Sequence, residues 1–290
     1  PPEEVLPPEV LQAYHILPAE RAYTAIHTPK TMEEAAMAKR RMIFEEFFVF
    51  SAGLAQLRRT RQTRRTAPYT DTDLTAFLAV LPFSLTGAQK RAIEDIRRDM
   101  TLGIPMNRLV QGDVGSGKTM VAAAAAFLAI RNGRQCALMA PTEILAAQHY
   151  EGIRTVCANL GITIELLTGS STKKEKECIY EGLADGRIQM IIGTHALIQE
   201  GVNFHNLGLV IIDEQHRFGV EQRARLQQKG TYPHVLIMTA TPIPRTMTLS
   251  VYGDLAVSLI KEMPPGRKPV KTYAVDSSYK ERLRTFFGKE

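Results

Sequence analysis

Over residues 1–66, apolar positions recur at the spacing of helices, and no run in this part has the character of a strand. Thr31 and Glu34 form a capping pattern that predicts the start of the longest helix there. That helix carries an apolar stripe made of Ile43, Phe44, Phe47, Phe48 and Phe50. Because a stripe this heavy is unfavourable in water, we expect the helix to pack against another element.

From about Asp71 onward, short apolar runs alternate with helical stretches. Six runs are predicted to be strands: Arg108–Gln111, Gln135–Ala140, Thr163–Leu167, Ile188–Ile192, Leu207–Asp213 and His234–Thr239. Their nearly continuous apolar character is typical of strands buried on both faces of a parallel sheet. The alternation of strands and helices predicts a three-layer α/β domain with a mainly parallel sheet. In such a sheet, ligands bind at the carboxyl ends of the strands.

These patterns predict three segments: an all-helical connector over residues 1–66, an α/β domain over residues 67–260, and a truncated unit over residues 261–290. Pro242–Ala256 is expected to be helical or irregular, and Pro264–Pro269 is typical of a linker. Val270–Val275 alternates as the first strand of another unit.

A glycine-rich run carries the clearest chemistry, and its residues are Gly112, Asp113, Val114, Gly115, Ser116, Gly117, Lys118 and Thr119. The pattern Gly, four residues, Gly-Lys-Thr is that of a phosphate-binding loop, and it lies between a predicted strand and a predicted helix as that motif requires. Its glycines allow backbone N–H groups to face phosphates, and the helix N-terminus adds partial positive charge. We expect Lys118 to bind the β- and γ-phosphates of ATP and Thr119 to bind Mg²⁺.

An acidic pair, Asp213-Glu214, follows the predicted strand Leu207–Asp213. After a phosphate-binding loop, such a pair is typical of an ATPase: Asp213 would hold Mg²⁺ opposite Thr119, and Glu214 would act as the general base for the attacking water. These two residues and Lys118 are therefore the predicted catalytic set.

Other polar residues are expected around the same nucleotide. Gln89 is predicted to bind the adenine edge, with Phe83 stacking on the ring. His216 is expected to contact the nucleotide or the turn at residues 239–241. In that turn, Thr239 and Thr241 are predicted to bond to the acidic pair and to report on the γ-phosphate.

Composition and charge exclude only a few classes of protein. Apolar residues make up 44% of the chain, enough for a sizeable core, and the net charge of +6 fits a polyanionic partner without requiring one. No apolar run is long enough to span a membrane, the N-terminus is not a secretory signal, and three cysteines argue against a disulfide framework. Five arginines within residues 58–65 suit either a solvated helix end or contact with a nucleic-acid backbone.

Together, Met106–Thr119, Asp213–Val220 and Thr239–Thr246 resemble the superfamily-two helicases, and most closely the RecG family of bacterial ATP-dependent DNA translocases. The resemblance extends over nearly the whole chain. It implies a RecA-like P-loop NTPase lobe after a helical connector, and ATP-driven movement on forked or branched DNA that reverses stalled forks and migrates junctions. It also implies a monomer in the bacterial cytoplasm, associated with the nucleoid.

The resemblance places further residues by role. DNA-facing residues would be Thr142, Gln148, Thr168, Gly169, Thr194 and His195, and the coupling residues would be Thr239, Thr241 and Arg245. The resemblance also implies that only the connector after a wedge domain and the start of a second RecA-like lobe, over residues 261–290, are included here, without the arginine finger that the second lobe supplies. We therefore expect this chain to bind ATP–Mg²⁺, to hydrolyse it poorly and not to unwind DNA.

Other interpretations stay open. The transcription-repair coupling factor shares much of the ATPase sequence, but its acidic motif usually lacks a histidine like His216. A nucleotide-switched nucleic-acid-binding module is a rival from another class. An RNA helicase is a third possibility, and a small-molecule kinase is disfavoured because no acceptor-pocket signature is evident.

Overall fold

The computed structural model describes residues 2–214, 217–241 and 255–263, together with residues 279, 280, 282 and 285. Its α-helices are α1 (Pro8–Ala13), α2 (Ala19–His27), α3 (Met32–Gln62), α4 (Thr75–Ala79), α5 (Gly87–Thr101), α6 (Lys118–Arg131), α7 (Glu143–Cys157), α8 (Lys173–Ala184) and α9 (Val220–Gln228). Its strands are β1 (Asn107–Gly112), β2 (Gln135–Met139), β3 (Ile164–Leu167), β4 (Met190–Gly193), β5 (Leu207–Asp213), β6 (His234–Thr239) and β7 (Ala256–Ile260). Two 3₁₀ turns are η1 (Ala158–Leu160) and η2 (His195–Ile198).

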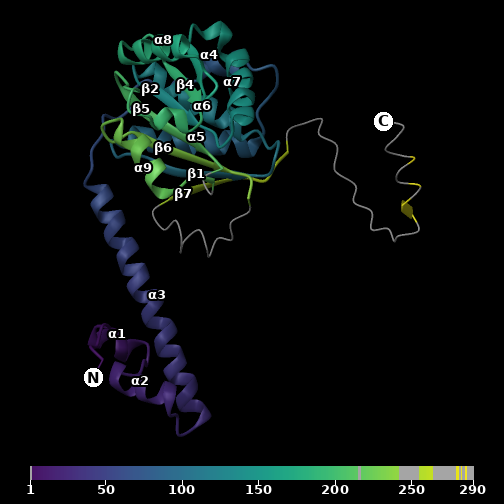
Figure 1. The fold of residues 1–290 in the computed structure, drawn as a ribbon. Coiled ribbons are helices and arrows are strands. Elements are labelled where there is room, and N and C mark those ends of the chain that lie inside the picture. Colours follow the sequence, from purple (N-terminus) through teal and green to yellow (C-terminus); the bar gives the residue numbers. More distant parts are fainter. Residues whose placement is uncertain are drawn as a thin grey trace.

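The described strands form one sheet in the order β3-β4-β2-β5-β6-β1-β7, and all of its pairings are parallel. Apolar residues of β1 to β6 are divided between two clusters, whereas β7 contributes only Ile260. One cluster includes residues of α4, α5, α6 and α7, and the other includes residues of α8, η2 and α9. Helices therefore cover both faces, as Figure 1 shows, and the predicted three-layer α/β fold is confirmed.

All six predicted strands are present, although β4 begins at Met190 rather than Ile188. A seventh strand, β7, which begins at Ala256, was not predicted. The expectation for Pro242–Ala256 falls almost wholly outside the described residues, which resume at residue 255. Strand β7 lies at the edge of the sheet, and only Ser258 and Ile260 along it are buried. Its residues are apolar at four of five positions, so the sequence carried the signal of a strand that the prediction did not use. The predicted linker Pro264–Pro269 and strand Val270–Val275 lie outside the described residues.

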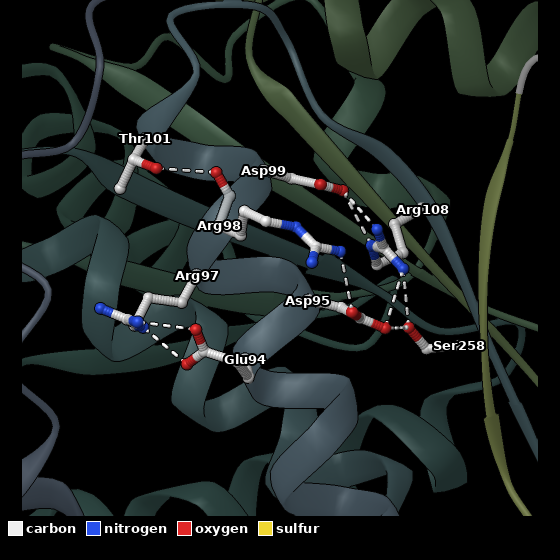
Figure 2. Close-up of polar contacts among 8 residues, drawn as sticks. All are labelled: Glu94, Asp95, Arg97, Arg98, Asp99, Thr101, Arg108 and Ser258. Carbon is white, nitrogen blue, oxygen red and sulfur yellow. Dashed lines mark hydrogen bonds and ion pairs between the residues drawn. The ribbon is translucent and has the colours of Figure 1, made fainter.

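A buried ion cluster fixes α5 against β1 and β7 (Figure 2). Arg108 is 5% exposed, and its guanidinium donates to Asp99 at 2.8 Å and to the Ser258 hydroxyl at 2.7 Å. Asp95 lies 3.3 Å from the same guanidinium and accepts from the Ser258 hydroxyl at 2.8 Å. Removing one partner of a buried ion pair typically costs about 3–5 kcal/mol. The cluster therefore holds this helix and the two strands in one arrangement.

Helix α3 extends away from the α/β domain and carries α1 and α2 near its other end (Figure 1). It begins as predicted, because the Glu34 N–H donates to the Thr31 hydroxyl at 3.1 Å. The side chain of Arg41 is fully buried and pairs with Glu4 at 2.6 Å, which ties the N-terminal segment to α3. None of the helices in the described part of the chain has both the length and the apolar content needed to cross a bilayer.

The apolar stripe of α3 is only partly covered. Phe44 contacts the Tyr14 ring with centroids 5.3 Å apart, and it stacks on Phe48 at 6.2 Å. In the described structure, the exposed fractions stay high at three positions, which are Ile43 (48%), Phe47 (59%) and Phe50 (44%). The helix therefore packs against another element as expected, but these three side chains of its stripe are left largely exposed.

His234 begins β6 as a buried, neutral imidazole. Its Nδ1 accepts from the Met106 N–H at 2.9 Å, and the Tyr69 ring packs edge-on against it with centroids 4.8 Å apart. Burial, followed by the charge of Arg134, lowers the pKa of His234 to about 4. Protonating this side chain therefore opposes folding.

We predict that the free energy of unfolding falls as the pH decreases from about 6.5 to about 4. The unfolded chain protonates His234 near its ordinary pKa of about 6.5, whereas the folded chain resists protonation down to a pKa of about 4. Stability from this group is therefore complete above about pH 6.5, and roughly 3 kcal/mol is lost as the pH reaches the folded pKa. Urea denaturation of the wild type and His234→Gln across this window measures the effect.

As the pH falls, the free energy of unfolding should decrease less for His234→Gln than for the wild type. The exposed His205 offers a matched control, and His205→Gln should keep the wild-type pH profile. Superimposable profiles for the wild type and His234→Gln would contradict the prediction.

Candidate nucleotide-binding site

The phosphate-binding loop connects β1 to α6 and relies on glycine at several positions. Gly115 and Gly117 have φ values of 78° and 83°, in the left-handed region that favours glycine. A Cβ at Gly112 would lie 2.5 Å from the Ser116 hydroxyl and 2.9 Å from the Ile260 carbonyl oxygen. The buried Ser116 Oγ has no hydrogen-bond partner among the described residues. These features fit a loop that presents its backbone to a bound group.

Lys118 lies at the start of α6 with its ammonium folded over the loop. Its Nζ donates to the carbonyl oxygens of Gly112 at 2.6 Å and Asp113 at 3.0 Å. Burial lowers the pKa of Lys118, and the nearby carboxylates of Asp213 and Glu214 oppose that change. The cation and the acidic pair therefore share one electrostatic environment, as the sequence predicts.

Gln89 supports the loop from α5. Its N–H donates to the Thr86 hydroxyl at 3.2 Å and its Oε1 accepts from the Thr86 N–H at 2.8 Å, which completes a capping box. Its Nε2 donates to the Ser116 carbonyl oxygen at 2.8 Å, and the residue is 2% exposed. The side chain thus contacts the loop itself, whereas Phe83 is 46% exposed near the same helix start. Their contacts with adenine stay predictions.

The acidic pair ends β5 in a constrained turn. Asp213 is 7% exposed, and Glu214 has a φ of 48°, which is uncommon for a residue with a side chain. The Glu214 carboxylate accepts from the Thr239 hydroxyl at 3.1 Å and from the Ala240 N–H at 3.0 Å. The Thr239 hydroxyl also accepts from the Thr241 N–H at 3.1 Å. The predicted hydrogen bond to the acidic pair is therefore present for Thr239, whereas Thr241 donates its N–H to Thr239.

His149, on α7, joins the two predicted metal-binding residues and was not predicted from the sequence. Its Nε2 lies 2.7 Å from Asp213 Oδ2, and its Nδ1 lies 3.5 Å from Thr119 Oγ1. The sequence did indicate that His149 lies on the core face of this helix, because it falls three residues after Ala146 and four before Ile153. In the structure both of these apolar residues are fully buried. A histidine on the core face of a helix usually has a polar partner, but sequence alone does not identify it.

The predicted DNA-facing residues follow β2, β3 and β4, which form the other half of the sheet. Gln148, Gly169 and His195 are exposed there. The hydroxyls of Thr168 and Thr194 are directed away from solvent, because these residues are 5% and 3% exposed. Direct contact between these two side chains and DNA is therefore disfavoured, and their place is in shaping the loops.

Glu143 fixes two of these loops to one another and was also missed. It follows Thr142, whose hydroxyl caps α7 by accepting from the Leu145 N–H at 3.3 Å. The Glu143 carboxylate accepts from the Ser170 hydroxyl at 2.9 Å and from its N–H at 3.2 Å. His216 and Arg245, predicted for the nucleotide and for coupling, lie outside the described residues.

Comparisons with known proteins agree with this geometry. The sequence profile of the DEAD/DEAH box helicases matches residues 86–249. Two proteins named ATP-dependent DNA helicase RecG are similar over nearly the whole chain. The protein from Synechocystis sp. is 46% identical over 98% of this chain, and that from Escherichia coli is 50% identical over 94%. The chain covers 35% and 41% of these relatives, so it spans less than half of their length.

Solved structures give the same result. The structure of RecG bound to a three-way DNA junction matches with a TM-score of 0.86 and 45% identity, over 99% of this chain and 39% of that chain. The DUF1998 helicase MrfA, in a crystal structure with DNA, matches with a TM-score of 0.55 and 17% identity over 76% of this chain and 35% of that one. The second match bears on the fold alone. The RecA-like fold expected from the sequence is confirmed.

We predict that Gly117→Ala disrupts nucleotide binding through the contact with α5. A Cβ at this position would overlap the Gln89 amide nitrogen, and the left-handed φ adds about 1–2 kcal/mol of strain. Nucleotide affinity, measured by titration with a fluorescent ATP analogue, should fall by at least about tenfold, equivalent to 1.4 kcal/mol.

Gly133→Ala is a matched control. Gly133 also has a left-handed φ, of 69°, but a Cβ there would meet nothing within 4 Å. This variant should lose stability while retaining wild-type nucleotide affinity. Equal affinities for the two variants would contradict the importance of the contact between Gln89 and the loop.

Proposed function

The chain belongs to the DEAD/DEAH box helicase family, and from this membership we propose that it is the ATP-binding motor lobe of a RecG-like DNA translocase. One observation carries the proposal: Lys118, Asp213 and Glu214 gather around a single phosphate-binding loop at the ends of β1 and β5. The relatives are named ATP-dependent, and the similar RecG structure is bound to a three-way DNA junction. The name supports ATP as the nucleotide that is hydrolysed, and the similar structure supports branched DNA as the partner.

Each residue at the phosphate end has a distinct chemical role in this proposal. Lys118 would bind phosphate oxygens, since its ammonium already lies over the loop. The Thr119 hydroxyl and the Asp213 carboxylate are hard oxygen ligands of the kind that Mg²⁺ prefers, and they share His149 as a neighbour. Mg²⁺ held there would offset the negative charge of the phosphates.

Glu214 would orient the attacking water and accept its proton. Its carboxylate is held by Thr239 and Ala240, so the turn after β6 sets the direction of the base. A shift in that turn would therefore change hydrolysis directly. This link supports Thr239 and Thr241 as coupling residues, with Arg245 and His216 proposed beside them on the family resemblance.

The other roles follow from position. Gln89 and Phe83 would bind adenine at the start of α5, where Gln89 also steadies the loop. The segments after β2, β3 and β4 would follow the DNA backbone, with Gln148 exposed on α7, Gly169 in the loop after β3 and His195 at the start of η2. Contacts of this kind position DNA without reading its bases.

We assign the three segments accordingly. Residues 1–66 would be the connector that follows a wedge domain. The Thr66 N–H donates to the Gly103 carbonyl at 3.1 Å, which supports a boundary there because the chain joins the α/β domain at this point. Residues 67–260 would be the first RecA-like lobe, and residues 261–290 would lead into the second. Acting with that lobe and the wedge as a monomer in bacteria, the protein would migrate branches and reverse stalled forks.

We predict that Glu214→Gln in the full-length protein abolishes hydrolysis while sparing nucleotide binding. The amide preserves the size of the side chain but accepts no proton, and loss of a general base typically costs about 10²–10⁴-fold in rate. ATPase assays with forked DNA, together with titration of a fluorescent ATP analogue, separate the two effects. Affinity should stay within about threefold of the wild type, a difference below 1 kcal/mol.

Glu221→Gln is a suitable control, because Glu221 is exposed on α9 and pairs with Arg225 at 2.7 Å. It should keep fork-stimulated turnover. If Glu214→Gln hydrolyses ATP at the wild-type rate on forked DNA, Glu214 is not the base. If it loses hydrolysis but still processes forks, the protein is a nucleotide-dependent switch rather than a motor.

A further inference from the structure

His149 has contacts that none of the roles above assigns. Its side chain is 12% exposed and lies between the Asp213 carboxylate, at 2.7 Å, and the Thr119 hydroxyl, at 3.5 Å. The two neighbours come from different elements, the end of β5 and the first turn of α6. A third element, α7, therefore places one imidazole against both residues proposed to hold Mg²⁺.

The chemistry of the carboxylate fixes the direction of the hydrogen bond between His149 and Asp213. An ionised carboxylate only accepts, so His149 Nε2 must donate to Asp213. The other nitrogen, Nδ1, faces the Thr119 hydroxyl, and whether it donates or accepts there depends on the tautomer. The imidazole thus lies between both neighbours, with the carboxylate at one side and the hydroxyl at the other.

The imidazole is held firmly by its helix. Ala146 and Ile153, on the same face of α7 as His149, are fully buried in the core. The N-terminus of α7 is fixed by the Thr142 cap and by the bonds from Glu143 to Ser170. A rigid support of this kind is needed if a side chain is to hold metal ligands in place.

We propose that His149 is a positioning residue for the metal site: it orients the Asp213 carboxylate and the Thr119 hydroxyl so that both present oxygen atoms to Mg²⁺. It binds neither the metal nor the nucleotide itself. The inference rests on the proposed function, since it assumes that Thr119 and Asp213 are the metal-binding pair.

The test measures Mg²⁺ affinity rather than turnover. The 290-residue chain, bound to a fluorescent ATP analogue, is titrated with Mg²⁺, and nucleotide affinity is measured separately in EDTA. Loss of a residue that orients metal ligands typically weakens metal binding about 10–100-fold. His149→Ala should therefore weaken Mg²⁺ binding by at least about tenfold, with nucleotide affinity in EDTA unchanged.

His149→Gln separates positioning from a packing effect. Its amide can still donate to Asp213, so it should restore most of the Mg²⁺ affinity that His149→Ala loses. Glu151→Gln, an exposed position on the same helix that pairs with Arg154 at 2.8 Å, should match the wild type. Thermal melts check that all three variants are folded.

Two results would overturn the inference: Mg²⁺ affinity in His149→Ala equal to that of the wild type, or a loss that His149→Gln does not reduce. A different result tests the proposed function. If the wild-type chain gains no nucleotide affinity from Mg²⁺, the pairing of Thr119 with Asp213 as metal ligands is itself wrong.

Discussion

The parallel pairing of β5, β6 and β1 is the constraint on which the site depends. Neighbouring strands of a parallel sheet end at the same edge, about 5 Å apart, whatever the length of chain between them. Asp213 pairs with Met238, and Gln111 pairs with Thr239, so the acidic turn and the phosphate-binding loop are separated by a single strand. The end of that middle strand supplies Thr239, which binds Glu214. The sheet register therefore turns a long separation in sequence into one polar site.

Helix α5 gives this edge its rigidity. Near its C-terminal end, Asp95 and Asp99 bind the buried Arg108 of β1, as Figure 2 shows. At its N-terminus, the Glu262 carboxylate, just beyond β7, accepts from the Ala88 N–H at 3.0 Å and pairs with Arg91 at 2.8 Å. The helix is thus fixed at both ends, and Gln89 transmits that rigidity to the phosphate-binding loop. A preformed loop binds phosphate without first losing conformational entropy.

Sequence patterns were sufficient for features that depend on local chemistry. Apolar runs located strands β1 to β6, and the order of glycine, lysine and threonine located the phosphate-binding loop. Strand β7 was missed although Ala256–Ile260 is apolar at four of five positions, so edge position alone does not explain the miss, since the other edge strand, β3, was predicted. His149 was missed because its partners lie on other elements. The apolar stripe of α3 shows what periodicity leaves open. The spacing identified the apolar face of the helix, but the exposed Phe47 shows that spacing does not determine how much of that face is buried. Contacts between distant elements depend on register and helix orientation, which single-residue patterns do not encode.

The central claim is that this edge of the sheet binds a nucleoside triphosphate through Lys118. The most direct test compares the ATP affinity of Lys118→Ala with that of Lys90→Ala, a control at an exposed lysine on α5. Isothermal titration with ATP and Mg²⁺ should show at least about a tenfold loss for Lys118→Ala, since a charge-assisted bond contributes about 1.5–3 kcal/mol, and no loss for Lys90→Ala. Undiminished ATP affinity in Lys118→Ala would contradict the account.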